Sequence, residues 1–142
     1  MNRKILYRIK DEEFHCWVYG VPYQCEHRER ELNLFLPFYI ENCPPNYTKL
    51  RCLDHTLGQY IGICDKNDVR IFEHDIVKVT EKYSQQDESP FIMIGEIVYE
   101  DCMFGLKTKD GKFYTPIWEN EELEVIGNSF DNKDWSNNND NL

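Results

Sequence analysis

Four residues in the first half of the chain are of types that bind zinc. Cys25 and His27 form a Cys-x-His pair, and Cys52 and His55 form a Cys-x-x-His pair. Structural zinc takes thiolate and imidazole ligands in tetrahedral sets of four. The first spacing is unusual, however, and a chain of 142 residues can bury a core without a metal. We therefore expect no metal site and no cofactor, and we interpret these residues as structural or incidental.

The six cysteines stand at positions 16, 25, 43, 52, 64 and 102, and no two form a Cys-x-x-Cys pair. No apolar signal core follows the charged start of the chain, so we expect reduced thiols, several of them small buried hydrophobic residues. A thiol nucleophile such as Cys64 or Cys102 would need a positioned histidine. No spacing in the sequence identifies one.

A second group that could do chemistry is the trio Glu73, His74 and Asp75, whose two carboxylates flank an imidazole. Such a trio can transfer protons. Acids placed before a core strand more often bind backbone N–H groups or stay solvated. The nucleotide-binding, zinc-protease and serine-hydrolase motifs are also absent from the sequence. We therefore expect no catalytic residues and no enzyme.

The charge of the chain limits the kinds of partner that it can bind. The net charge is −10 and the pI is about 4.8, which disfavours direct nucleic-acid binding because phosphate contacts require a basic surface. The acidity serves either ordinary solubility or attraction to a basic partner protein. No apolar run reaches the roughly 18 residues of a membrane span, so we expect no membrane partner and a cytoplasmic location in a bacterial host.

The elements that position these residues centre on residues 57–79. Residues 59–63 alternate as a short strand, and residues 65–68 follow as a polar turn. Ile71 and Phe72 return to an apolar surface before residues 76–79, a β-branched run with one lysine. We expect the Asp75 carboxylate to accept nearby backbone N–H groups while Ile76 or Val77 enters the core.

The remaining segments are mostly predicted strands. Residues 5–9 and 14–19 read as a hairpin, residues 91–99 as a strand with a bend or bulge at Gly95, and residues 103–107 and 112–117 as a hairpin around Asp110-Gly111. Residues 119–124 read as an acidic turn, residues 123–126 as a last strand and residues 81–89 as a mobile loop. Four prolines divide residues 21–45, which we interpret as an irregular insertion.

The central segment resembles the YopX family, small proteins encoded by phages and prophages. The matching residues are Gly58-Gln59-Tyr60, Gly62, Asp65-Lys66-Asn67, Ile71, Glu73 and Asp75-Ile76-Val77. The resemblance continues at residues 95–99 and 124–128 and is weaker at residues 3–8 and 17–20, which resemble the family's opening hairpin. The chain departs from the family pattern where Asp68 and His74 replace two glycines. A side chain at these turn positions implies a wider or more strained turn. The resemblance implies no assigned activity and brings no catalytic residues.

Together these observations predict a mainly β protein: an SH3-like small β-barrel with an N-terminal hairpin and an irregular insertion. We expect one YopX-like domain over residues 1–135, with its barrel core at about 57–128, and a disordered tail over 136–142. We expect a phage or prophage accessory protein that binds a host protein, with a host defence or regulatory system as one target, or itself. The alternatives are a structural homo-oligomer and an enzyme of unrecognised type.

The predicted binding residues lie in the insertion. Phe35, Phe38 and Tyr39 belong to an aromatic, proline-interrupted stretch that a minimal barrel does not need. Aromatic side chains contribute large contact area at interfaces. The same residues could instead form a satellite core, since contiguous exposed apolar patches are uncommon on monomers.

Overall fold

The computed structural model describes residues 4–27, 30–40, 52–81, 91–114, 121–132 and 134–135. The chain divides into two compact units, Met1–Tyr60 and Ile61–Leu142. That they fold as one domain over residues 1–135 stays a prediction. The predicted tail (136–142) and most of the predicted loop at 81–89 lie outside the described residues.

The first unit is an antiparallel sheet with the order β3-β2-β1-β4. Its strands are β1 (Tyr7–Asp11), β2 (Trp17–His27), β3 (Arg30–Ile40) and the first part of β4 (Cys52–Cys64). The predicted N-terminal hairpin is confirmed, with Ile9 opposite Val18 in β1 and β2. Both of these side chains are buried, together with Leu6.

The turn of this hairpin is longer than predicted, because Asp11 holds it. Its carboxylate Oδ2 accepts hydrogen bonds from the backbone N–H groups of Glu13 at 3.1 Å and Phe14 at 2.8 Å. A carboxylate that binds two successive N–H groups fixes a turn and delays the next strand. The second strand therefore begins at Trp17 instead of at Phe14.

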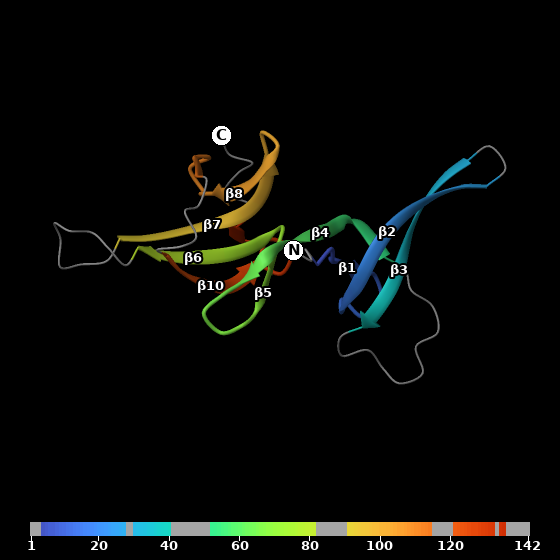
Figure 1. Cartoon of the computed structure of the whole chain (residues 1–142), viewed down its shortest axis with the longest axis horizontal. Coiled ribbons are helices and arrows are strands. Elements are labelled where there is room, and N and C mark those ends of the chain that lie inside the picture. The colour runs from blue at the N-terminus through green and yellow to red at the C-terminus, as the bar shows by residue number, and fades with distance from the viewer. Residues whose placement is uncertain are drawn as a thin grey trace. The chain divides into compact units, whose positions relative to one another are not determined.

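The prediction of an irregular insertion is wrong for the described residues 21–27 and 30–40. They form most of a long hairpin between β2 and β3, paired from Val18 opposite Ile40 to His27 opposite Arg30 (Figure 1). The prolines are tolerated because of their positions. Pro22 lies beyond Gly20, the last β2 residue paired with β1, and Pro37 lies on β3, which ends the strand order. Prolines in sheets are tolerated mainly at such edge positions, where one side of the strand has no neighbour to pair with.

The second unit is built on an antiparallel sheet with the order β10-β6-β7-β8-β9. Its strands are β6 (Asp75–Glu81), β7 (Phe91–Glu100), β8 (Met103–Lys107), β9 (Phe113–Tyr114) and β10 (Glu121–Asn128). Figure 1 shows β10 returning beside β6 after the β6-β7-β8 meander. The last part of β4 lies next to β5 (Arg70–Phe72) in this unit.

One face of this sheet carries the hydrophobic core. Its buried members come from five strands and are Ile71, Val77, Val79, Ile97, Leu106 and Leu123. Val79 and Ile97 each lie between two half-buried residues along their strands, as expected for a sheet with one buried face. Both Ile76 and Val77 are buried, so the predicted core strand is confirmed.

The mainly β prediction is confirmed, since the described chain consists of two antiparallel sheets. The Asp110-Gly111 hairpin is also confirmed, with Lys107 opposite Phe113. The predicted acidic turn at 119–124 is wrong from Glu121 onward, because those residues pair with β6. The described strands do not close into a barrel, and the SH3-like barrel stays a prediction.

Gly95 marks a close approach between strands and not the predicted bend or bulge. The register between β6 and β7 continues through Val77 opposite Gly95 without a shift. A Cβ atom at Gly95 would lie 2.5 Å from Leu106 Cγ and 2.9 Å from the Lys107 carbonyl oxygen. The glycine therefore makes room for a core leucine of β8.

We expect Gly95→Ala to lower the free energy of unfolding by about 2 kcal/mol, because an added methyl overpacks the core against Leu106. Urea unfolding followed by circular dichroism measures the change. Shortening the neighbour in Gly95→Ala/Leu106→Val should restore part of the loss. Equal stability of Gly95→Ala and the parent would contradict the close packing.

Candidate functional site

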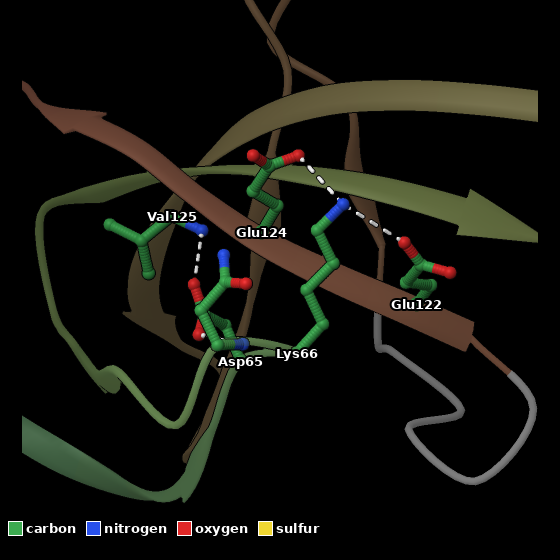
Figure 2. Close-up of polar contacts among 6 residues, drawn as sticks. Asp65, Lys66, Glu122, Glu124 and Val125 are labelled. Atoms are coloured by element: carbon green, nitrogen blue, oxygen red, sulfur yellow. Dashed lines mark hydrogen bonds and ion pairs between the residues drawn. The ribbon is translucent and has the colours of Figure 1, made fainter.

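The carboxylate of Asp65 links the polar turn after β4 to β10. Asp65 Oδ1 accepts hydrogen bonds from the N–H groups of Asn67 at 2.8 Å and Val69 at 3.0 Å. Its other oxygen, Oδ2, accepts from Val125 N–H at 2.9 Å, across 60 residues of sequence (Figure 2). Asp65 is buried, with 6% of its surface exposed. The residue thus closes its own turn and fixes that turn to the last strand.

Lys66 continues this contact along β10. Its backbone N–H donates to the Leu123 carbonyl oxygen at 2.9 Å. Its ammonium group lies between two carboxylates of the strand, 3.1 Å from Glu122 and 3.3 Å from Glu124 (Figure 2). The turn therefore satisfies backbone groups on the edge of β10 that faces away from β6, where an open strand would invite pairing with another chain.

Two turn residues that replace glycines of the family pattern have left-handed backbones. Asp68 has φ 62° and His74 has φ 72°. Aspartate and histidine are among the non-glycine residues that adopt this region most often, at a modest cost. The inference of more strained turns at these two positions agrees with the geometry. The turns themselves are kept, since Asp68 N–H donates to the Asp65 carbonyl oxygen at 3.1 Å.

The trio Glu73-His74-Asp75 forms the turn into β6. The Asp75 carboxylate is buried and accepts the Phe72 N–H at 2.9 Å, which confirms its predicted capping role. His74 connects three segments: its N–H donates to the Ile97 carbonyl oxygen, and its own carbonyl oxygen accepts from Ser129 N–H. Its ring lies edge-on to Phe130, with centroids 5.0 Å apart. Asp75 and His74 therefore stabilise the turn at the start of the core strand β6.

Sequence reasoning missed a groove in the second unit with a volume of about 510 Å³. Three isoleucines, Ile76, Ile94 and Ile126, line it together with Trp135 and four polar residues: Lys109, Asp131, Asn132 and Asp134. The sequence signal was a set of isoleucines out of phase with the core residues of their strands, which places them on the other face of the sheet. The partners could not be named, because they come from separate segments.

The predicted partner-binding residues lie on β3. Phe35 is half-buried, while Tyr39 is 62% exposed and its ring centroid lies 6.1 Å from that of Tyr19 on β2. Leu36, between them in sequence, is 50% exposed. The side chain of Phe38 lies outside the described part of the chain.

The four residues of zinc-binding type, for which we expect no metal, are only partly described, since the side chains of Cys25 and His27 lie outside the described residues. Cys52 is half-buried and His55 is exposed. Burial raises the pKa of the Cys52 thiol, and the charges of Asp11 and Asp54 add to the rise. Among the described side chains, no group of three or more histidines, cysteines or acids could hold a metal ion.

The described cysteines, at positions 16, 52, 64 and 102, form no disulfide bond with one another. The prediction that several cysteines are buried is wrong for these four, because they lie at strand ends and in turns and are half-buried or exposed. No helix in the described part of the chain is long and apolar enough to cross a membrane.

The Asp65 contact gives a pH-dependent prediction. Burial alone would raise the pKa of this carboxyl, but the N–H groups of Val125, Val69 and Asn67 and the charge of Lys66 outweigh it, so the pKa is lowered. A group whose folded pKa is depressed stabilises the fold above its unfolded pKa of about 3.9, and this stability is lost as the pH falls through the folded pKa.

We therefore expect Asp65→Asn to lower the free energy of unfolding by about 1–3 kcal/mol at pH 7, because an amide cannot accept all three N–H groups. The gap to the parent should narrow as the pH falls below about 4, the unfolded pKa of an aspartate, toward the lower pKa of Asp65 in the folded protein. Urea unfolding of the parent and the variant at a series of pH values measures this difference in the free energy of unfolding. Lys66→Gln is the control, since it keeps the backbone bond to Leu123; its smaller effect should vanish in high salt. A gap independent of pH would refute the assigned role of the carboxylate.

Comparison with known proteins identifies the family. No curated protein matches the chain significantly. The family model described as YopX protein matches residues 6–134, which include the Asp65 turn, the His74 turn and both sheets. The match covers most of the chain, and the protein belongs to the YopX family.

Proposed function

We propose that this YopX protein is a phage or prophage accessory protein that acts by binding another protein in the cytoplasm of a bacterial host. The observation that carries the proposal is the exposed face of the β2–β3 hairpin. Tyr39 and Leu36 project from β3 with 62% and 50% of their surfaces exposed. Large apolar side chains that are exposed on one strand are candidates for a contact surface.

Three features of this hairpin suit an anchor site. Tyr39 lies opposite Tyr19 in the pairing of β2 and β3, so the two rings form a cross-strand aromatic pair. A tyrosine offers a large, rigid contact area and loses little side-chain entropy on binding. Phe35 lies opposite Pro22 on the same hairpin and is half-buried. We propose Phe35, Phe38 and Tyr39 as the anchors of the contact.

The charge of the chain favours a basic partner. With a net charge of −10, long-range attraction accelerates encounter with basic surfaces, and the rate falls as salt screens the charges. A host protein that itself binds nucleic acid, as many defence and regulatory proteins do, has such a surface. For this acidic chain, a host defence or regulatory protein of that kind is therefore a better candidate partner than nucleic acid itself.

A structural homo-oligomer is the second candidate. β3 ends the strand order of its sheet, and a terminal strand can pair with the same strand of another copy. Leu36 and Tyr39 would then be covered by their symmetry mates. Pro37, which lies between them in sequence, lacks an N–H and weakens such pairing. This proline is the reason to rank a different protein above the homo-oligomer. An enzyme of unrecognised type ranks last, because the sequence contains no recognised catalytic motif.

We also propose that the second unit is an SH3-like small barrel. Two observations support strong curvature: β10, the last strand, returns to pair with β6, and an extra residue between Val125 and Gly127 shifts the register of that pairing. Such bulges increase the local twist and allow sheets to curl. The Asp65 turn covers the outer edge of β10.

The proposed contact predicts that Tyr39→Ala weakens partner binding by about 2 kcal/mol, or about 30-fold, because an aromatic anchor is lost. Phe38→Ala tests the neighbouring candidate anchor. The measurement is capture of partners from host lysate on immobilised protein, identified by mass spectrometry and then titrated with the purified partner. Light scattering of the parent and both variants reports the oligomer mass.

Tyr99→Ala is the matched control. Tyr99 is 55% exposed on β7 and contacts the ring of Phe104, so the change removes a similar side chain from the other unit. It should leave binding unchanged. Loss of a higher oligomer mass in Tyr39→Ala, without loss of a partner, would select the homo-oligomer. Unchanged partners and mass in folded Tyr39→Ala and Phe38→Ala would reject the contact.

A further inference from the structure

The groove of the second unit has an apolar floor on the sheet face opposite the core. Ile94 lies opposite Lys78, one residue out of phase with the core residues Val77 and Val79. Ile126 is the extra residue of the β10 bulge, and such a residue is aimed differently from its neighbours. Ile94 is 40% exposed and Ile126 is 46% exposed, while Ile76 beneath them is buried. The floor therefore presents aliphatic surface to solvent.

The wall of the groove is a turn after β10 that is held in place by hydrogen bonds. Asn128 Oδ1 accepts hydrogen bonds from the N–H groups of Phe130 at 3.1 Å and Asp131 at 2.9 Å. The Asn128 amide also donates to the Asp131 carboxylate at 2.9 Å. Trp135 N–H then donates to the Asn132 carbonyl oxygen, and the indole is buried. The wall is thus fixed by backbone contacts, and the groove is a formed feature of the unit.

The charges that line the groove favour a cation. Two of its lining residues, Asp131 and Asp134, are acids with exposed side chains, and one, Lys109, is a base. The Lys109 ammonium lies 5.1 Å from the centroid of the Trp135 ring, so this indole already accepts a cation. A second cation brought by a ligand would meet the two carboxylates, whereas an anion would be repelled by them and by the net charge of the chain.

We propose that this groove binds a short segment of a partner protein in which a lysine or arginine lies beside aliphatic side chains. The aliphatic side chains cover Ile94 and Ile126, and the cation lies between Asp131 and Asp134, next to the Trp135 ring that Lys109 already contacts. The site is separate from the aromatic face of the β2–β3 hairpin and does not depend on it. The groove residues belong to the second unit and the hairpin to the first.

The test uses two capped hexapeptides, one with lysines among leucines and one with glutamates in place of the lysines. Each is titrated into the isotopically labelled full chain, and nuclear magnetic resonance follows the isoleucine methyl groups and the indole N–H signals. The lysine peptide should shift the signals of Ile94, Ile126 and Trp135 with a dissociation constant on the order of 1 mM. The glutamate peptide should leave them in place.

Charge-reversal variants separate the groove from general attraction. Asp134→Lys should weaken binding of the lysine peptide at least about fivefold, since it places a like charge at the site. Asp54→Lys makes the same change in net charge at an exposed position of the first unit and should leave binding unchanged. Ile126→Lys, at a half-exposed position outside the core, should also weaken it.

Three outcomes would overturn the proposal. The first is an absence of shifts at Ile94 and Ile126 in the parent. The second is equal binding of the two peptides, and the third is equal weakening in Asp134→Lys and Asp54→Lys. Because the peptides are defined probes, these results stand whether or not Tyr39→Ala changes the capture of host proteins.

Discussion

One carboxylate does the most to connect the second unit. Asp65 accepts three backbone N–H groups, two from its own turn and one from Val125 on the last strand. A charged acceptor makes stronger hydrogen bonds than a neutral one, and in a buried position it would be costly without them. The turn between β4 and β5 is thereby held against β10, and its backbone replaces the partner strand that the edge of β10 lacks. Without this carboxylate the end of the sheet would expose unpaired N–H groups.

The features that sequence could predict are those decided within a few residues. The Asp65 turn, the Asp75 cap and the Asp110-Gly111 hairpin each depend on side chains that bind a backbone within four positions, so their geometry follows from residue type. The left-handed backbones of Asp68 and His74 could be inferred because glycine is usual at both positions in the family. The mainly β fold followed from the alternation of apolar residues.

The features that escaped prediction depend on segments far apart in sequence. The prolines of residues 21–45 argued against strands. A proline removes only its own N–H, however, and the sheet order gives Pro22 and Pro37 a neighbouring strand on one side alone. The sequence suggested a bend or bulge at Gly95, whereas the structure places the side chain of Leu106 beside this glycine. The groove joins β6, β7, β10 and two turns, and no local pattern in the sequence relates Ile94 to Trp135.

This division between local and distant features also bears on where recognition can lie. The polar groups of the family motif are occupied by the fold: Asp65 binds three N–H groups, Asp75 binds Phe72, and the His74 backbone joins two other segments. A group that already satisfies buried backbone cannot also bind a partner without exposing that backbone, at a cost of about 1–3 kcal/mol for each group. Recognition is therefore better placed on surfaces outside the motif. The exposed hairpin face at Tyr39 and the isoleucine groove beside Trp135 are two such surfaces, and neither contains Asp65 or Asp75.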